Sequence, residues 1–356
     1  MMRVAIDYRL AALSNRGMAR YARELTRCLL EGHPDTDWRL LVTPKGYAAI
    51  EQEHPEWVDR LVRLPYEGMV TAEQLGMAEI VRSMHADVLW CPYNTMPIGK
   101  LGRTKLLVTV HDLIFLDPIK GGSLRQRLGA LYRRWLIKRV CKRADRLLTV
   151  SHFTKNELVN RLGVPQDKVR LTFNKVDGFF KLYVELHGKV QKENRYFTVS
   201  GDAPHKNLPM LLRYFAEHPE EQLVVAGVPV HAPLRKEAPG NVWFLPPVSD
   251  KVLAEQYLSC KGFVFISRKE GFGLPVAEAI VAECPMLLSN VSSIPEVAGG
   301  LGVYVDPTSY ESLCEGFEQL KTYEVDGPAY HRQRDRYLDW SREADSLFAV
   351  CQSVLY

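Results

Sequence analysis

The sequence lacks any long apolar run. In its 356 residues, no stretch approaches the roughly 18 uncharged apolar residues that suggest a membrane-spanning helix. Arg3 and Asp7 interrupt the first apolar residues, which is unlike a signal peptide. The seven cysteines are scattered and form no Cys-x-x-Cys pair, a pattern that fits reduced thiols and argues against disulfides or a zinc site. We therefore expect a cytoplasmic protein.

A strong excess of charge is also missing. The net charge is +4, which argues against a dedicated nucleic-acid-binding protein. Positive charge is nevertheless concentrated, because residues 121–150 hold nine Lys or Arg and one Asp, a local charge of +8. No Gly-x-Gly-x-x-Gly motif follows the first apolar run. A nicotinamide-dependent dehydrogenase is therefore disfavoured.

What the chain does contain is a regular alternation of short apolar runs with helix-length segments. Such alternation is typical of parallel sheets covered by helices on both faces. It predicts an α/β protein with two doubly wound, Rossmann-like domains facing across a cleft, with ligands bound beyond the carboxyl ends of the strands. The runs are residues 3–7, Trp38–Thr43, Asp87–Cys91, Lys105–Val110, Arg146–Val150, Arg195–Ser200, Gln222–Ala226, Asn241–Leu245, Gly262–Ile266, Met286–Ser289 and Gly302–Val305.

A less regular region around residues 178–192 separates the runs into two series. We therefore place the first domain at residues 1–180 and the second at residues 181–335. Apolar residues at helical spacing between Tyr330 and Tyr356 predict a closing helix whose apolar face must be buried. Residues 336–356 are assigned to that helix.

The most informative stretch joins an apolar run to a helix through a glycine-containing turn. The run is typical of a buried strand, and Pro275 suits the start of a helix. Gly271 and Gly273 allow main-chain N–H groups to approach a ligand closely. Because a helix N-terminus favours anions, this loop is expected to bind phosphate. Glu270 and Glu278 flank it, either as ordinary surface acids or as groups that hold hydroxyls.

With its two glutamates separated by seven residues, this stretch resembles the donor-binding signature of the retaining glycosyltransferases of family 4, which have the GT-B fold. The resemblance implies that Glu270 contacts hydroxyls of the donor sugar and that Glu278 contacts the ribose of its nucleotide. Ionised carboxylates are strong acceptors, so hydroxyl recognition agrees with hydrogen-bond chemistry. The backbone that would lie against sugar and phosphate belongs to Gly271, Phe272, Gly273 and Leu274.

The resemblance extends upstream to the stretch from Gly201 to Leu208. Family members have a lysine directly before Asn-Leu that neutralises the departing diphosphate, and here that lysine is Lys206. They commonly also have an arginine at or near the position of His205, and this sequence does not. His205 would supply the second positive charge only if protonated. By resemblance, Gly201 and His205 are assigned to donor binding and Lys206 to catalysis.

In the first half of the chain, His111 ends an apolar run and resembles the histidine of the family's His-Asp pair. The resemblance places His111 near the donor sugar and the acceptor, as a third catalytic residue beside Lys206 and Glu270. The alternative is a histidine that is hydrogen-bonded locally at a strand end. Gly17 lies where relatives have a loop with two or more glycines that touches phosphate and acceptor. Its neighbour Arg16 is either a ligand or a surface residue.

The reaction that the resemblance implies moves a hexose from a nucleotide diphosphate sugar to an acceptor hydroxyl, with retention at the anomeric carbon. Relatives with these motifs often build bacterial surface polysaccharides from GDP-mannose, so mannose transfer to a lipid-linked saccharide is the first choice. UDP-hexoses and dTDP-rhamnose remain open as donors. No cofactor or metal is expected, since no His/Cys cluster has ligand spacing. A GT-B sugar-nucleotide epimerase and a non-catalytic sugar-nucleotide-binding subunit are the alternatives.

The basic stretch of residues 124–143 carries Leu124, Leu128, Leu131 and Trp135 at helical spacing. One interpretation is a helix that packs on the core through this face. The other is an interfacial surface that draws the protein to anionic lipid, where a lipid-linked acceptor would lie. On the second interpretation the protein is peripheral on the inner face of a membrane.

Overall fold

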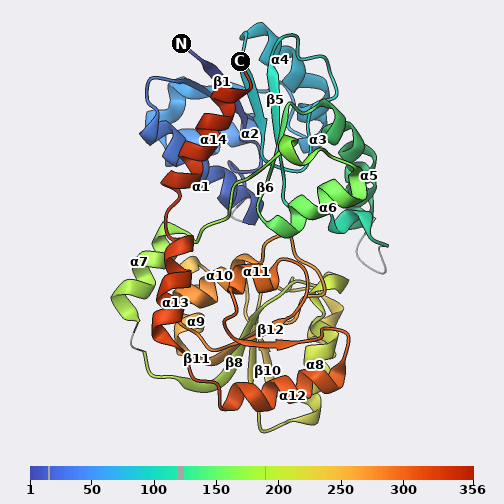
Figure 1. Cartoon of the computed structure of the whole chain (residues 1–356), viewed down its shortest axis with the longest axis vertical. Helices are drawn as coiled ribbons and strands as arrows, with labels where there is room; N and C mark the ends of the chain where they lie inside the picture. Colours follow the sequence, from blue (N-terminus) through green and yellow to red (C-terminus); the bar gives the residue numbers. More distant parts are fainter. Residues whose placement is uncertain (15–16, 119–123, 189) are drawn as a thin grey trace. The chain divides into compact units, whose positions relative to one another are not determined.

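The computed structural model describes residues 1–14, 17–118, 124–188 and 190–356. They form two compact units, each built from one sheet and the helices around it (Figure 1). The N-terminal unit comprises residues 1–116, 128–174 and 339–356, and the C-terminal unit comprises residues 117–127 and 175–338. The sequence alone places boundaries at residues 180 and 335.

The N-terminal unit is organised around a parallel sheet with the strand order β3-β2-β1-β4-β5-β6-β7. Its central strands are almost wholly buried, as expected when helices cover both faces. β2 and β3 lie on one side of β1 and the other strands on the opposite side, so β1 and β4 form the switch point of the sheet. The strands are β1 (Arg3–Asp7), β2 (Asp37–Val42), β3 (Leu61–Arg63), β4 (Val88–Cys91), β5 (Lys105–Val110), β6 (Arg146–Thr149) and β7 (Val169–Leu171).

Helical segments of the N-terminal unit include α1 (Gly17–Gly32), α2 (Pro44–Glu53), α3 (Met69–Thr71), a π-helical turn (Ala72–Met77), α4 (Ala78–Ser83), α6 (His152–Leu162), α14 (Ser341–Ser353) and, from residue 128 onward, α5 (Leu124–Arg143). In α1, Tyr21, Leu25 and Leu29 are buried, the spacing expected of an amphipathic helix. α6 starts after Ser151, whose side chain accepts a hydrogen bond from the Thr154 amide. α14 packs along α1 and closes the unit.

The C-terminal unit repeats this plan with the strand order β10-β9-β8-β11-β12-β13. All pairs are parallel, and β8 and β11 occupy the switch point. The strands are β8 (Glu193–Val199), β9 (Leu223–Ala226), β10 (Val242–Phe244), β11 (Cys260–Phe265), β12 (Met286–Ser289) and β13 (Val303–Val305).

The helices of the C-terminal unit include α7 (Gly178–His187), α8 (Leu208–Glu217), α9 (Asp250–Ser259), α10 (Leu274–Val281), α11 (Ile294–Ala298), α12 (Tyr310–Lys321) and α13 (Gly327–Arg334). The apolar faces of α8 and α12 share one core cluster with the sheet. At its centre Phe317 lies edge-on to Tyr196 and Phe215, with ring centroids 5.1 and 5.7 Å away. This packing fixes β8, which leads into the candidate site.

The predicted parallel sheets are confirmed, because every predicted run overlaps an observed strand. β3 and β7 are additional edge strands, each of three residues and therefore too short to give a clear pattern. The prediction of a single closing helix from Tyr330 to Tyr356 is wrong, since α13 and α14 are separate helices. Between them Asp339 Oδ1 accepts a hydrogen bond from the Ser341 amide at 2.9 Å, a local turn that interrupts the helical path and starts α14.

Candidate active site

Two loops meet at the switch point of the C-terminal sheet. The first follows β8 and contains Lys206, and the second follows β11 and contains Glu270. Since β8 and β11 are neighbouring parallel strands, both loops leave the same edge of the sheet. The Arg268 amide donates to the His205 carbonyl at 2.7 Å and joins the two loops. They therefore form one surface at the position where open α/β sheets bind ligands.

Lys206 and Glu270 form an ion pair on this surface. Lys206 Nζ donates to Glu270 Oε1 at 2.7 Å, and it also lies 5.5 Å from the centroid of the Phe265 ring. The side chains are 24% and 11% exposed, so water screens the pair only in part. Asn207 fixes the end of the lysine loop, because its side-chain amide donates to the Pro307 carbonyl at 2.8 Å. Two of the predicted catalytic residues are thus brought together.

Serines from the next βα unit hold the glutamate loop. Ser292 Oγ accepts a hydrogen bond from the Glu270 amide at 3.1 Å. The hydroxyl of Ser293 lies 3.1 Å from the Glu270 carbonyl and 2.8 Å from the Phe272 carbonyl, to which it donates. The backbone of Glu270 is therefore fixed on both its N–H and its C=O sides.

The glycine loop leads directly into α10. Gly273 precedes the helix with a φ of 95°. A Cβ at this position would meet no atom closer than 3.7 Å, so glycine is needed for the backbone conformation rather than for space. Gly271 and Phe272 are buried beside it, whereas Leu274 is half-buried at the start of the helix. In the first turn of α10, Pro275 has no N–H group and the Val276 amide donates to the Gly273 carbonyl at 2.9 Å, so the helix dipole is the main feature of this end that favours phosphate.

Glu278 lies one turn further along α10 and has a different environment from Glu270. It is 3% exposed. The Tyr257 hydroxyl, from α9, donates to Glu278 Oε2 at 2.9 Å. The carboxylate predicted to bind ribose is therefore held by a side chain that the sequence did not single out.

His205 lies in the loop after β8, directly before Lys206. Burial lowers the pKa of His205, an effect that the Glu270 carboxylate opposes. This shift favours the neutral imidazole, and the predicted role of His205 at the diphosphate stays a prediction. Gly201 follows the end of β8 and is half-buried.

In the N-terminal unit, His111 is a buried residue at the end of β5. It is 5% exposed, and its Nε2 lies 2.8 Å from the Pro92 carbonyl. A carbonyl only accepts hydrogen bonds, so Nε2 carries the proton and Nδ1 is left as an acceptor. Burial lowers the pKa of His111 to about 4. His111 therefore acts as a neutral hydrogen-bonding group near pH 7.

Further contacts fix the backbone of His111. Its amide donates to Asn94 Oδ1 at 2.6 Å, and its carbonyl accepts from Thr154 Oγ1 at 3.2 Å. Gly17 is exposed at the start of α1 in the same unit, while Arg16 lies outside the described residues. The predicted roles of His111 and Gly17 stay predictions.

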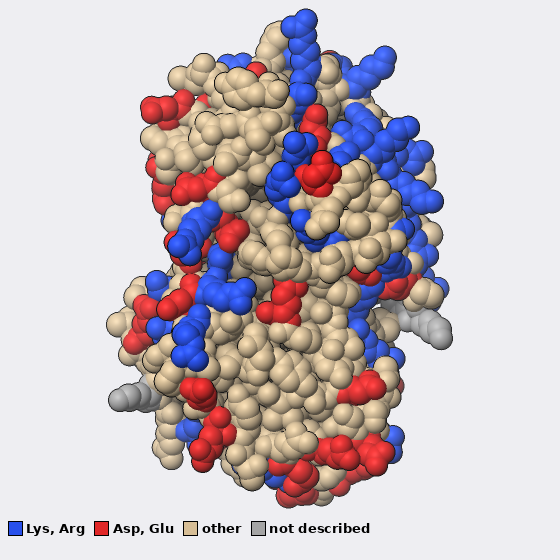
Figure 2. Space-filling view, in the orientation of Figure 1, with Lys and Arg blue, Asp and Glu red and all other residues tan. Residues whose placement is uncertain are grey.

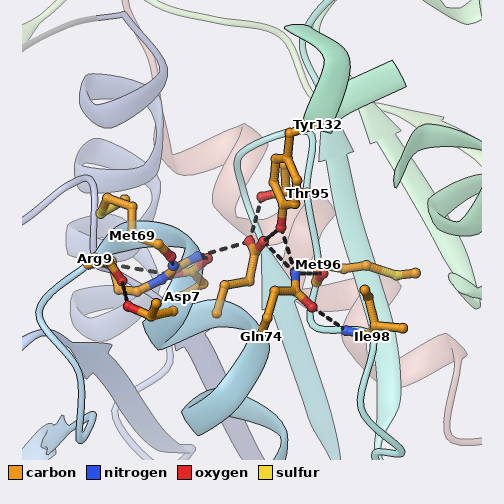
Figure 3. Close-up of polar contacts among 11 residues, drawn as sticks. Asp7, Arg9, Met69, Gln74, Thr95, Met96, Ile98 and Tyr132 are labelled. Atoms are coloured by element: carbon orange, nitrogen blue, oxygen red, sulfur yellow. Dashed lines mark hydrogen bonds and ion pairs between the residues drawn. The ribbon is translucent and has the colours of Figure 1, made fainter. Parts of the chain in front are cut away.

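A buried polar network occupies the switch point of the N-terminal sheet (Figure 3). Arg9 and Glu73 are each 2% exposed. The Arg9 guanidinium donates to Asp7 Oδ2 at 2.7 Å and to Glu73 Oε1 at 3.0 Å. Figure 3 shows Asp7 beside Arg9, and dashed lines from Arg9, Thr95 and Tyr132 that end on one carboxylate, that of Glu73. The loops after β1 and β4 are therefore joined through one carboxylate.

Glu73 is the centre of that network. Its Oε1 also accepts from Thr95 Oγ1 at 2.5 Å, and its Oε2 accepts from the Tyr132 hydroxyl at 2.5 Å and from Gln74 Nε2 at 2.8 Å. Tyr132 belongs to α5, so the network also connects the basic helix to the switch point. All four donors are satisfied by one buried acceptor, which makes the network structural support rather than an open ligand site.

The exposed face of α5 carries both apolar and basic residues. Leu128, Leu131 and Trp135 are 57%, 55% and 48% exposed, whereas Leu136 and Ile137 are buried. The interpretation in which the first three pack on the core is therefore wrong, because the helix uses its other face for packing. Figure 2 shows Lys and Arg gathered on the side where Figure 1 labels α5. Exposed basic residues there include Arg127, Lys138, Arg139 and Lys142.

The described residues form neither a membrane-spanning helix nor a cluster of metal ligands. Within the described ranges, no helix combines the length and apolarity needed to cross a bilayer. Over the same residues, no three His, Cys, Asp or Glu side chains gather as metal ligands.

Family models match both halves of the chain. One described as Glycosyltransferase Family 4 matches residues 15–177, and one described as Glycosyl transferases group 1 matches residues 181–336. The chain belongs to the family 4 glycosyltransferases. The motifs around Lys206 and Glu270 lie in the second matched range, and His111 lies in the first.

Several relatives of this glycosyltransferase are mannosyltransferases. It is 27% identical over 258 residues to an O-antigen chain mannosyltransferase of Salmonella typhimurium, a match that covers 69% of each chain. It is 28% identical over 229 residues to O-antigen chain mannosyltransferase B of Escherichia coli, covering 59% of each. The MMP alpha-(1->4)-mannosyltransferase of Mycolicibacterium hassiacum is 29% identical over 220 residues, or 57% of this chain and 52% of that relative. The matches thus span between about half and about two thirds of these relatives.

Solved structures show the same fold. Sucrose-phosphate synthase from Thermosynechococcus elongatus matches with a TM-score of 0.70 and 14% identity, over 99% of each chain. The Anabaena protein HepE, solved with UDP and glucose, matches with a TM-score of 0.68 and 15% identity, over 99% of this chain and 100% of that one. With the two parallel sheets, these matches confirm the predicted GT-B fold.

Sequence reasoning missed three groups, two in the C-terminal unit and one in the N-terminal unit. Tyr257 has the spacing of an ordinary core residue of α9, and only its hydroxyl contact with Glu278 reveals its role. Ser292 and Ser293 follow β12 and reach the Glu270 loop only through the fold. Glu73 gives no signal in the sequence, and its role follows from its contacts with Arg9, Thr95 and Tyr132.

Proposed function

We propose that this glycosyltransferase moves mannose from GDP-mannose to a hydroxyl of a lipid-linked saccharide, with retention at the anomeric carbon. The donor is proposed from the relatives, of which two are named O-antigen chain mannosyltransferases. HepE binds UDP and glucose, so UDP-hexoses are the second choice of donor. The acceptor is proposed from the same relatives, because O-antigen chains are surface polysaccharides.

The observation that carries the proposal is the Lys206–Glu270 ion pair at the switch point. The two charges neutralise each other, with Lys206 Nζ 2.7 Å from Glu270 Oε1. A bound nucleotide sugar offers a diphosphate to the lysine and hydroxyls to the carboxylate, so each member of the pair gains a partner of suitable chemistry. Lys206 and Glu270 together can therefore bind a ligand in which an anionic group lies next to hydroxyl groups.

Charge stabilisation of the leaving group supplies the catalysis in this proposal. As the bond from the anomeric carbon to the diphosphate breaks, negative charge grows on the phosphate oxygens. Lys206 and the N-terminus of α10 would both stabilise that charge. These groups take the role that a metal has in other transferases, so we expect transfer to continue in the presence of EDTA.

Glu278, the second glutamate of the motif, has a different role from Glu270 in this proposal. Glu278 is buried against Tyr257, and we assign it to the ribose. Glu270 is assigned to hydroxyls of the sugar rather than to covalent attack. Retention then requires front-face substitution, in which the departing phosphate takes the proton of the acceptor hydroxyl. His111, neutral near pH 7, is assigned a hydrogen bond to donor or acceptor.

Incubation with a panel of donors tests the proposal. The panel is GDP-mannose, UDP-glucose, UDP-galactose and dTDP-rhamnose, with a polyprenyl-diphosphate-linked saccharide as acceptor. We expect release of GDP from GDP-mannose that depends on the acceptor, and an axial anomeric linkage in the product by NMR. Interconversion of donors without acceptor would favour an epimerase instead. Binding without turnover would favour a non-catalytic subunit.

We also propose that α5 docks the enzyme on the inner, anionic face of a membrane. Its exposed leucines and tryptophan would enter the interface while its basic residues meet lipid headgroups. Each basic residue contributes about 1 kcal/mol at such a surface. Four changes to Gln should therefore weaken binding to phosphatidylglycerol vesicles by up to about 4 kcal/mol. The residues to change are Arg127, Lys138, Arg139 and Lys142.

A matched control removes the same charge elsewhere on the N-terminal unit. Its four changes to Gln are at the exposed residues Lys45, Arg63, Arg103 and Arg170. If both variants lose vesicle binding equally, net charge alone explains the attraction and α5 is not the docking surface. Serine in place of Leu128, Leu131 and Trp135 should weaken binding even at unchanged charge.

A further inference from the structure

Tyr257 connects two helices at the candidate donor site. Its side chain is fully buried on α9. Its hydroxyl lies 2.9 Å from Glu278 Oε2 and 3.2 Å from the Pro275 carbonyl, both on α10. A single hydroxyl therefore contacts the first turn of α10 and the carboxylate one turn later.

The ring of Tyr257 is held by three phenylalanines from different elements. Phe180 of α7, Phe197 of β8 and Phe263 of β11 have ring centroids 5.5, 5.0 and 5.0 Å away. Two of these contacts are edge-to-face, which adds attraction beyond burial. Since β8 and β11 also carry the Lys206 and Glu270 loops, the hydroxyl is held in register with the rest of the site.

A glutamate needs such a partner to act as a precise acceptor. Its side chain has several rotatable bonds, and ordering them costs conformational entropy. Burial and the neighbouring carboxylate raise the pKa of Tyr257 well above its usual value, so the phenol stays protonated and remains a donor. A carboxylate has two oxygens and about four acceptor positions, so a carboxylate that accepts from Tyr257 can accept from hydroxyls of a sugar ring as well.

We infer that Tyr257 is the positioning residue that orients Glu278 toward the ribose and thereby makes the donor site prefer ribonucleotides. The inference rests on the proposed function, in which Glu278 accepts hydrogen bonds from the ribose hydroxyls. Tyr257 acts only through Glu278. Losing its hydroxyl should therefore weaken recognition of ribose hydroxyls and leave contacts with base and diphosphate unchanged.

Nucleotide binding by calorimetry tests the inference. The probes are GDP and UDP, each compared with its 2′,3′-dideoxy counterpart, and the readout is the ratio of the two dissociation constants. For the wild-type protein we expect the ribonucleotide to bind at least about tenfold more tightly, the worth of one good hydrogen bond. In Tyr257→Phe this ratio should fall by about threefold or more, while the dideoxy nucleotide binds as before.

Tyr330→Phe is the matched control. Tyr330 is fully buried in the same unit, and its hydroxyl donates to the Cys284 carbonyl at 3.0 Å. Its loss should lower the melting temperature and leave the ribose ratio unchanged. A second variant, Glu278→Gln, should lower the ratio by itself, and adding Tyr257→Phe to it should lower the ratio no further.

Other results would overturn the inference in distinguishable ways. A wild-type ratio that persists in Tyr257→Phe would make Tyr257 a packing residue only. Equal loss of affinity for both nucleotides in Tyr257→Phe would show a general disturbance of the site. A wild-type protein that binds the diphosphates without preferring ribose would remove the assigned role of Glu278. A protein that binds none of the nucleotides would remove the proposed function together with the inference.

Discussion

Replacing Glu73 by Gln should destabilise the N-terminal unit by about 3 kcal/mol, the lower end for a broken buried ion pair. The carboxylate accepts hydrogen bonds from Arg9, Thr95, Gln74 and Tyr132. The hydroxyls of Thr95 and Tyr132 can turn and accept instead. Arg9 and the amide nitrogen of Gln74 can only donate. These two donors decide the result, because Arg9 contacts Oε1 and Gln74 contacts Oε2.

An amide at position 73 has one oxygen, so either Arg9 or Gln74 must face its N–H group whichever way it turns. Removing one partner of a buried ion pair costs about 3–5 kcal/mol. Asp7 still pairs with Arg9 at 2.7 Å, which is why we take the lower end. For a unit of this size, each kcal/mol lowers the melting temperature by about 2–4 °C. The expected shift is therefore about 6–12 °C.

Differential scanning calorimetry of the intact protein measures this shift, because two units can unfold in separate transitions. Hydrogen exchange gives a local readout. The Ile98 amide donates to Gln74 Oε1 at 2.9 Å and should exchange faster in Glu73→Gln.

The control is Glu31→Gln, which also removes a carboxylate paired with an arginine in the same unit. Arg27 lies 2.9 Å from Glu31, whose side chain is 62% exposed. Its loss should change stability by less than about 0.5 kcal/mol. Should Glu73→Gln melt no earlier than Glu31→Gln, the argument that burial makes this carboxylate costly to neutralise is refuted.

The catalytic assignments give further predictions. Lys206→Ala should lower kcat by about 10²–10³-fold, the loss expected for one group that stabilises developing charge; steady-state kinetics with the preferred donor measures it. Glu270→Ala should abolish transfer, and retention of full activity would contradict its role. Glu278→Ala should mainly raise KM for the donor, as a ribose contact requires. Burial lowers the pKa of His111 to about 4, whereas the usual value is 6.5, so the unfolded chain binds the extra proton between these values. Stability should then fall by about 3 kcal/mol as pH drops from about 6.5 to 4, and unfolding of His111→Gln should show a shallower pH dependence over that range.

Local sequence patterns were sufficient for the fold class and for the strand, glycine turn and helix that contain Glu270 and Glu278. Apolar runs at strand length report local conformation directly. Gly273 likewise indicates a backbone conformation that other residues rarely adopt, and it has that conformation with φ at 95°. The start of the last helix was not accessible in this way, because Tyr337, Trp340 and Ala344 keep apolar helical spacing across the turn in which Asp339 accepts from the Ser341 amide.

The partners of the site residues came only from the tertiary structure. Lys206 and Glu270 are 64 residues apart and meet because β8 and β11 are neighbours across the switch point. Tyr257 reaches Glu278 because α9 and α10 both pack beside β11. Spacing along the chain gives the face of an element but not the element that will lie against it.

The basic helix α5 also shows which features follow from the sequence and which follow from the tertiary structure. The sequence determined that residues 124–143 form a helix with positive charge and apolar residues at helical spacing. Apolar residues occur on both of its faces, so spacing alone could not say which face would be buried. Packing decided it, since Leu136 and Ile137 are buried and Leu128 and Trp135 are exposed. Periodicity is a property of neighbouring residues, whereas burial depends on every element that the fold places nearby.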